Sequence, residues 1–236
     1  MNKNVGVIIF IVLIISVVGI FSFSILGHTI FVLSPNLLVH FNSNNETLNE
    51  SFIFYDSELV DDEIFGKVYE FEGNGYIRTN NPTSIDVNKG FSVSALAYVD
   101  DHEMRNSIGI VSASIQNETM GFRIKYRNFE ENDRFYVDLG TTKNEEYFLM
   151  KKGECYRKWC HYAFTYNPNG IVKIYLNGNK VKEFQSEKNL IFSSKINIGK
   201  TIDINQEYFK GKILDVRIYK GVLSDKDVKE ISQNIL

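Results

Sequence analysis

The sequence predicts an all-β fold: a two-sheet antiparallel jelly-roll sandwich with a short C-terminal helix, preceded by one transmembrane helix. Three observations support this prediction. Short apolar segments follow one another at spacings of about 8–15 residues, turn residues separate them, and one long uncharged apolar run stands near the N-terminus. The expected parts are a cytosolic tail over 1–4, a transmembrane helix over 5–26, a short stalk over 27–36 and a jelly-roll domain over 37–236.

The apolar run reads VGVIIFIVLIISVVGIFSFSIL, from Val5 to Leu26, and contains no charged residue. A helix of about 20 apolar residues crosses a bilayer, whereas the apolar core of a cleaved signal peptide is normally about 7–15 residues long. A cleaved signal and a buried helix are the alternatives, but residues 23–27 are a poor cleavage site. We therefore expect a signal anchor.

The orientation of this anchor follows from the positive charges around it. Lys3 and the amino terminus precede the run, and the next Lys or Arg is Lys67. Positively charged flanks stay in the cytosol. The N-terminus is therefore expected in the cytosol, and the C-terminal domain is expected outside the cell, in a lumen or on a virion surface.

The strand predictions rest on alternation and on turn residues. Phe91, Val93, Ala95, Ala97 and Val99 share one face of a strand with period two. Turns are expected at 72–75, at 167–170 and at Asn177-Gly178, the last two being hairpin signals. The other strands are expected over 37–41, 67–71, 76–78, 122–126, 134–139, 162–166, 171–176, 195–198 and 212–219.

Only the C-terminal end reads as a helix. Ser224 is expected to cap it, with Asp225 and Asp227 in the first turn, where the helix dipole favours negative charge. Val228 and Ile231 begin its apolar face, which ends at Ile235.

Composition narrows the possible classes of function. The chain has 236 residues, is 44% hydrophobic and carries a formal net charge of −3. This composition excludes a disordered or collagen-like chain, and the two cysteines exclude a miniprotein held by a disulfide framework. The charge is not that of a nucleic-acid-binding protein, so no nucleic-acid partner is expected.

Several stretches, in this order, carry a resemblance to a known family: KVYEFEGNGYI, GFSVSALAYV, WCHYAFTY, NGIVKIYLNGNKV, INIGK and YFKGKILDVRIYKGVLSDKDVKEI. From Leu37 to Ile235 the chain resembles the laminin-G-like domains of the concanavalin A-like lectin–glucanase jelly rolls. The resemblance implies this fold and a role in binding glycans or protein partners, often with calcium. Some relatives are glycoside hydrolases.

The resemblance also bears on individual residues. Trp159 matches a core strand of the family, which implies that its indole packs in the core of the sandwich, and we expect His161 to be hydrogen-bonded inside the domain. Asp56-Ser57 stands where family members often carry an Asp-Ser stretch that can help to hold calcium. Calcium is left open, and no ligands are assigned to it.

Cysteines and sequons give further candidate sites. Cys155 and Cys160 could form a disulfide in an oxidising compartment, with free thiols and a metal site as the alternatives. Asn45, Asn49 and Asn117 begin Asn-x-Ser/Thr sequons, and the expected outside location would make them usable for glycosylation.

Catalysis has little support in the sequence. Retaining glycosidases need two carboxylates about 5–5.5 Å apart, and in jelly-roll hydrolases these come from an alternating acidic motif such as ExDxE, which does not occur here. We therefore do not expect an enzyme. The first hypothesis is a single-pass membrane protein that presents its domain for recognition of a glycan or a protein surface. A structural envelope or scaffold protein is the second, and a glycoside hydrolase the third.

Overall fold

A computed structural model of the chain describes residues 22–25, 28–31, 36–44, 51–100, 107–114, 120–140, 146–186, 192–201 and 207–236. The chain divides into two compact units, Met1–Pro35 and Asn36–Leu236. The asparagines of the three sequons, Asn45, Asn49 and Asn117, lie outside the described residues.

In the first unit, strand β1 (Ser22–Ile25) pairs antiparallel with strand β2 (His28–Phe31). The predicted transmembrane helix over 5–26 is therefore wrong at 22–25, where polar and apolar residues alternate as strands favour, and the stalk expected over 27–36 contains a strand. Residues 5–21 and 26 lie outside the described residues. No helix among the described residues is long and apolar enough to cross a membrane.

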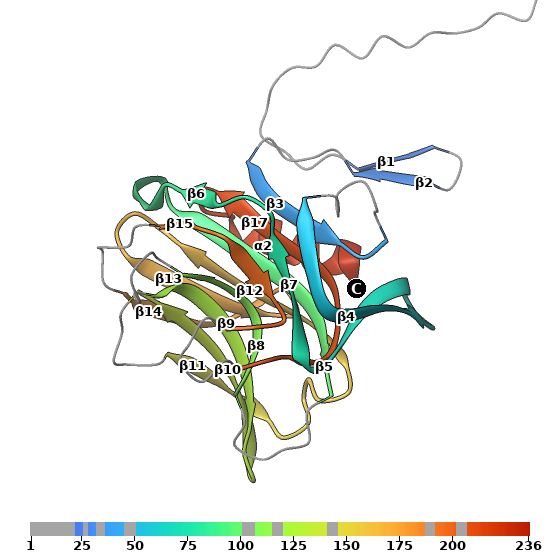
Figure 1. Cartoon of the computed structure of the whole chain (residues 1–236). Helices are drawn as coiled ribbons and strands as arrows, with labels where there is room; N and C mark the ends of the chain where they lie inside the picture. The colour runs from blue at the N-terminus through green and yellow to red at the C-terminus, as the bar shows by residue number, and fades with distance from the viewer. Residues whose placement is uncertain are drawn as a thin grey trace, which may run out of the picture. The chain divides into compact units, whose positions relative to one another are not determined.

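The second unit is an all-β antiparallel sandwich with one short C-terminal helix, as predicted (Figure 1). Its strands are β3 (Leu37–Asn42), β4 (Phe52–Asp62), β5 (Gly66–Thr79), β6 (Thr83–Ile85), β7 (Phe91–Val99), β8 (Ser107–Ser114), β9 (Met120–Asn128), β10 (Asn132–Leu139), β11 (Tyr147–Lys151), β12 (Trp159–Tyr166), β13 (Ile171–Leu176), β14 (Asn179–Gln185), β15 (Phe192–Ser194), β16 (Ile196–Ile198) and β17 (Lys210–Lys220).

Hydrogen bonding links most strands in the order β11-β10-β9-β8-β16-β5-β17-β7-β12-β13-β14, with β3 beside β17 and β4 beside β5. This continuous path folds over at β5. The second half of β5 pairs with β16, while its first half pairs with β17. We call β8–β11 with β16 and the end of β5 the first sheet, and β7, β12–β14, β17 and β3 the second sheet.

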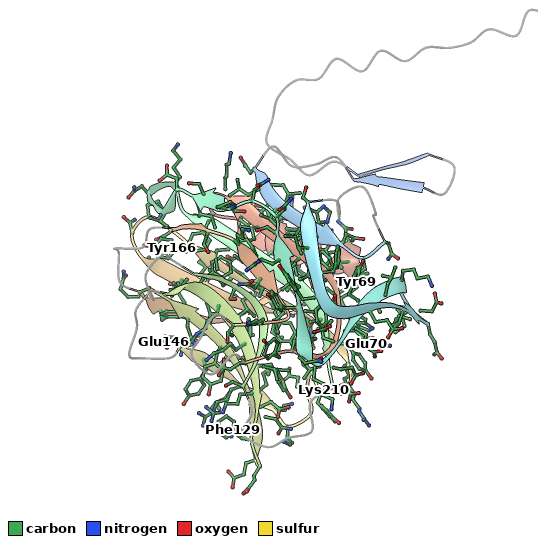
Figure 2. All side chains as sticks on the ribbon, viewed as in Figure 1. Tyr69, Glu70, Phe129, Glu146, Tyr166 and Lys210 are labelled. Carbon is green, nitrogen blue, oxygen red and sulfur yellow. A yellow bond between two sulfur atoms is a disulfide. The ribbon has the colours of Figure 1, made fainter. Side chains whose placement is uncertain are left out.

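The core fills the space between the two sheets, where aromatic side chains of one sheet meet those of the other. Phe122 of the first sheet lies 5.9 Å from Phe91 and 5.6 Å from Phe164 of the second, and Phe135 lies 5.1 Å from Tyr162 (ring centroids). Figure 2 shows side chains filling the region between the layers. The alternation predicted for 91–99 is confirmed, because Phe91, Val93, Ala95, Ala97 and Val99 all belong to this core.

Helix α2 (Asp225–Ile235) covers part of the outer face of the second sheet. Ser224 caps it as predicted, and the side chain of Asp227 completes a capping box. Val228 packs on Ala163 of β12 and Tyr175 of β13. Asp225 accepts hydrogen bonds from Lys173 and from the Tyr175 hydroxyl, at 2.9 and 2.7 Å.

The predicted turn at 72–75 is wrong, because β5 continues through it as one strand. The ladder is nevertheless interrupted there: β4 pairs with β5 up to Phe71 and again from Tyr76, β17 pairs with it only up to Glu72, and Gly73 has a φ of 88°. A Cβ at Gly75 would lie 1.9 Å from the carbonyl oxygen of Asp56, so glycine here permits close approach of β4 and β5 rather than a chain reversal.

Candidate functional site

The outer face of the first sheet differs from that of the second. Instead of a helix, a chain segment lies against it at Lys200 and Thr201, next to β8, and at Glu207, next to β9. Ser112 donates to the carbonyl of Lys200 at 2.7 Å. A Cβ at Gly109 would lie 2.4 Å from the nitrogen of Thr201, so β8 carries a glycine where this segment crosses it.

A buried charge network lies under this segment. Asp138 accepts from Arg123 at 2.6 Å and lies 3.2 Å from Lys125, whose ammonium is 3.8 Å from Glu207. Lys125 is 1% exposed and Asp138 1% exposed. Two cations and two carboxylates therefore hold the crossing segment on the sheet.

A second group of side chains lies toward β4 and β5. We call Tyr55, Tyr76, Arg78, Lys200 and Tyr208 the tyrosine–cation cluster. Tyr55 and Tyr76 are cross-strand partners whose rings stack at 4.4 Å with an interplanar angle of 11°. The ammonium of Lys200 lies 4.6 Å from the ring centroid of Tyr76 and 4.7 Å from that of Tyr208.

The cations of this cluster interact with tyrosines rather than with carboxylates. Arg78 donates to the hydroxyl of Tyr55 at 2.9 Å, and Lys200 donates to that of Tyr208 at 3.2 Å. Neither cation has an acidic partner within the described part of the chain. Their donors are therefore available to a ligand with acceptor oxygens.

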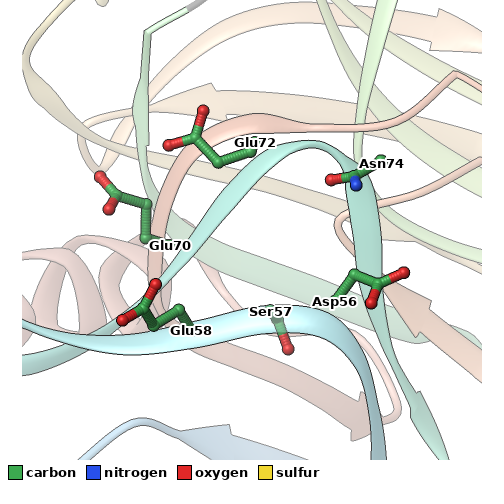
Figure 3. A pocket seen from close by; sticks show the side chains of 6 residues that line it. All are labelled: Asp56, Ser57, Glu58, Glu70, Glu72 and Asn74. Carbon is green, nitrogen blue, oxygen red and sulfur yellow. The ribbon is translucent and has the colours of Figure 1, made fainter.

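An acidic pocket begins where the stacked tyrosines end, because Tyr55 precedes Asp56 and Asn74 lies two residues before Tyr76. The pocket has a volume of about 350 Å³. Figure 3 shows Glu70 and Glu72 of β5 and Glu58 of β4 toward one side of it, with Asp56 and Asn74 toward the other. It is lined by Asp56, Ser57, Glu58, Glu70, Glu72 and Asn74.

The carboxylates of the acidic pocket are unusual in lacking cationic partners. None of the four forms an ion pair with a Lys or Arg of the described residues. Glu58 lies directly opposite Glu70 in the β4–β5 register, and Asp56 sits at a bulge with a φ of 45°. The pocket can therefore accept hydrogen bonds from a ligand rich in donors.

These carboxylates do not converge on a point. Within the described ranges, no three or more His, Cys, Asp or Glu side chains form a set that could hold a metal ion. Asp56 and Ser57, the stretch associated with calcium by resemblance, lie in the pocket wall. Their arrangement with Glu58, Glu70 and Glu72 suits several separate hydrogen bonds better than one ion.

His161 of β12 lies on the other outer face, that of the second sheet. This histidine is 0% exposed, and neither ring nitrogen has a hydrogen-bond partner, although we expected one. Burial lowers the pKa of His161 to about 4, against the nearby carboxylate of Asp215, which favours the charged ring. The ring of His161 is therefore closed to solvent.

Trp159 lies on this same outer face and not in the core between the sheets, where we expected it. Cys160, Tyr162 and Phe164 of β12 point into the core, so the odd-numbered residues point outward. Trp159 is half-buried against the cluster of Val68, Leu96 and Leu214, with its ring 5.1 Å from that of Phe65. The indole of Trp159 therefore packs in a small apolar cluster outside the main core, which we call the satellite cluster.

Cys155 and Cys160 are joined by a disulfide. Both are buried, and the bond closes the loop that leads into β12. It lies far along the chain from the acidic pocket and serves to fix the start of a core strand.

The tyrosine–cation cluster was not predicted from the sequence, and of the acidic pocket only Asp56 and Ser57 were, as a stretch that can help to hold calcium. Tyr55 meets Tyr76 through the β4–β5 register, and Lys200 reaches them from a segment more than a hundred residues later. Alternation places Glu70 and Glu72 on one face of a strand. Because a turn was predicted at 72–75, this pair was interpreted as the edge of a turn and not as part of a site.

Comparisons with known proteins agree with the fold. The chain resembles the binding domain of botulinum neurotoxin serotype D, with 18% identity over 84% of this chain and 52% of that one, at a TM-score of 0.61. For the binding domain of botulinum neurotoxin DC in complex with rat synaptotagmin II, the identity is 15% over 85% and 52% of the chains, at a TM-score of 0.62. The chain thus spans about half the length of these domains.

For a third solved structure, the similar region covers more than two thirds of both chains. A SAP-like pentraxin from Limulus polyphemus has 14% identity over 69% of this chain and 80% of that one, at a TM-score of 0.57. A search of curated proteins finds no match. A family model of laminin G type, described as the concanavalin A-like lectin/glucanases superfamily, matches residues 71–229, which is more than half of the chain. The chain therefore belongs to the concanavalin A-like lectin/glucanases superfamily.

Proposed function

We propose that this protein is a surface recognition protein whose sandwich domain binds a glycan at the acidic pocket and the adjoining tyrosine–cation cluster. The observation that carries the proposal is their juxtaposition on β4 and β5. Four carboxylates that have no cationic partner among the described residues lie next, along the chain, to a stacked tyrosine pair. Two cations that likewise have no described carboxylate partner contact these tyrosines. No catalytic step is part of the proposal.

The chemistry of a sugar fits this arrangement. Sugar hydroxyls donate hydrogen bonds, which Glu58, Glu70 and Asp56 can accept, and they also accept from donors such as Arg78. Tyrosine offers an apolar ring with a polar tip, which suits a ligand with apolar C–H faces and polar edges. A site that is concave, with a few fixed polar groups, is the usual form of a small-ligand site.

The proposal also includes attachment of the domain to a membrane and its orientation. The uncharged run over 5–21, whose length is within the range that crosses a bilayer, and the position of Lys3 support an N-terminal anchor with the domain displayed outside. Protease added to sealed vesicles should digest the C-terminal domain from the outer or lumenal side. Digestion from the cytosolic side would contradict this orientation.

Binding of the full-length chain to a glycan array, in calcium and in chelator, tests the proposal. We expect a restricted set of glycans to bind, and the difference between the two conditions shows whether calcium takes part. An array on which no glycan binds in either condition would exclude glycan recognition. A protein surface would then take its place, since the similar binding domain of botulinum neurotoxin DC forms a complex with a protein, rat synaptotagmin II.

A further inference from the structure

A second site candidate lies at the far end of the first sheet, on β10 and β11. We call Phe129, Arg134, Tyr147 and Leu149 the Arg134 patch. The guanidinium carbon of Arg134 lies 4.0 Å from the ring centroid of Phe129 and 4.5 Å from that of Tyr147. Figure 2 labels Phe129, which follows β9 in the hairpin to β10. Two aromatic rings therefore hold the guanidinium in place.

The hydrogen-bond donors of Arg134 are not matched by an anion. Its Nε is buried without a partner, and Nη1 has only the hydroxyl of Tyr136, at 3.4 Å. No described carboxylate pairs with it. By contrast, Arg123, Arg157 and Arg217 each have a carboxylate at 2.6–2.7 Å. An arginine fixed by rings and lacking a counter-ion is prepared to receive a carboxylate from outside.

An exposed apolar side chain stands beside this cation. Leu149 is the cross-strand partner of Arg134 and is 52% exposed. Arginine and aromatic residues are enriched at the centres of protein–protein interfaces, and an exposed leucine gives such a centre apolar area to bury. A leucine adds nothing for a sugar's hydroxyl groups, so the composition of the patch favours a protein segment over a glycan.

Strand β11 is the edge of its sheet, but side chains already occupy backbone groups at its two ends. Lys182 donates to the carbonyl of Tyr147 at 2.9 Å, and the nitrogen of Lys151 donates to the carboxylate of Glu154 at 3.0 Å. These side chains block the addition of a partner strand at both ends of β11. A partner must therefore dock on side chains rather than extend the sheet.

We propose that the Arg134 patch is a docking site for an acidic protein segment. An Asp or Glu carboxylate of the partner accepts hydrogen bonds from Arg134, and an apolar residue beside it packs on Leu149. The choice of an acidic partner rests on charge complementarity, because Arg134 is a cation fixed between two rings with no anion paired to it among the described residues. This site is separate from the proposed glycan site and does not depend on it.

The test is a selection on the full-length chain from a random peptide library displayed on phage. We expect enrichment of peptides that combine Asp or Glu with a neighbouring Leu, Ile or Phe. A synthetic copy of an enriched peptide should bind Arg134→Gln about ten- to a hundred-fold more weakly than the wild type, the range for a lost charge-assisted hydrogen bond. Its amide version, with Asn or Gln for the acid, should lose as much, and combining the two changes should add little.

Controls separate docking from folding and from net charge. Arg157→Gln removes the same charge from an exposed ion pair with Asp100 and should leave peptide binding unchanged. Leu149→Ser keeps Arg134 and should weaken peptide binding several-fold. This variant tests the docking site if Arg134→Gln proves unfolded. The proposal is overturned if no acidic peptide is enriched, if Arg134→Gln and Leu149→Ser bind as the wild type does, or if anionic glycans and not peptides bind in an Arg134-dependent way.

Discussion

Arg217 and Asp215 stand two residues apart on β17 and form a two-pronged ion pair, with Nε to Oδ1 at 2.7 Å and Nη2 to Oδ2 at 3.1 Å. Asp215 is 0% exposed and also accepts from His40 and Asn42 of β3, both at 2.9 Å. Burial alone would raise the pKa of Asp215, but Arg217 and His40 hold it well below its usual range. This carboxylate therefore ties β3 to the second sheet.

Asp215→Asn should lower the free energy of unfolding by about 3–5 kcal/mol, because Arg217 stays largely buried without a counter-charge. Asp61→Asn is the matched control, since it breaks an exposed ion pair with Lys67 and should cost less than about 1 kcal/mol. Denaturant titration of both variants measures the difference. Equal losses would show that the buried pair contributes no more than a surface one.

His161 gives a prediction about pH. Burial lowers its pKa from 6.5 to about 4 in the folded chain, so between these values the unfolded chain binds more protons than the folded one. The free energy of unfolding should therefore fall as pH drops from about 6.5 to about 4, by on the order of 3 kcal/mol from this group. Denaturant titrations across this range should show the fall in the wild type and a much smaller one in His161→Leu.

Glu183→Gln, altered at an exposed ion pair with Lys180, should keep the wild-type pH dependence. An unchanged slope in His161→Leu would mean that other groups cause the acid sensitivity.

Substitutions at Trp159 and at Phe164 compare how much the satellite cluster and the main core contribute to stability. Phe164 is 0% exposed and lies 5.5 Å from Phe91 and 5.6 Å from Phe122, so Phe164→Ala should cost about 3–5 kcal/mol. Trp159 is half-buried and belongs to a much smaller apolar cluster, so Trp159→Ala should cost less, about 2 kcal/mol. Denaturant titrations decide the order. A larger loss for Trp159→Ala would contradict its place outside the core.

The disulfide predicts both a thiol count and a loss of stability. The chain has no cysteines besides Cys155 and Cys160, so the native protein should contain no thiol that alkylates before reduction. Intact mass before and after reduction and alkylation checks this. Breaking the short loop should cost about 2 kcal/mol in the chain-entropy estimate. A protein that melts at the same temperature with and without reductant would show that the bond adds nothing to stability.

Strands with one clearly apolar face could be predicted from the sequence, while others could not. Residues 91–99 alternate regularly because one side faces the core. Strand β4 was missed because its side chains are mostly exposed or half-buried, and acidic residues occupy much of it. Strand β8 was missed because residues 108–113 are buried on both faces of the strand, so no alternation appears.

The candidate sites were harder to predict from the sequence than the fold was. Side chains of β4 and β5 meet through strand register, and whether Arg78 or Arg134 has a carboxylate partner depends on residues distant in the chain. A regular pattern did exist in β9, where Arg123, Lys125 and Arg127 alternate with apolar residues. It indicates a cationic outer face, but it does not show which cations are neutralised.

Glycan binding by the acidic pocket is the central claim, and one measurement tests it most directly. The glycan bound most strongly on the array is titrated into the full-length wild type, Glu70→Gln and Glu183→Gln by calorimetry. Glu70 lines the pocket, whereas Glu183 lies on β14 in a surface ion pair, so both changes remove one carboxylate. We predict that Glu70→Gln weakens binding about ten-fold or more while Glu183→Gln binds as the wild type does. Equal affinities of all three proteins would contradict the assignment of this pocket.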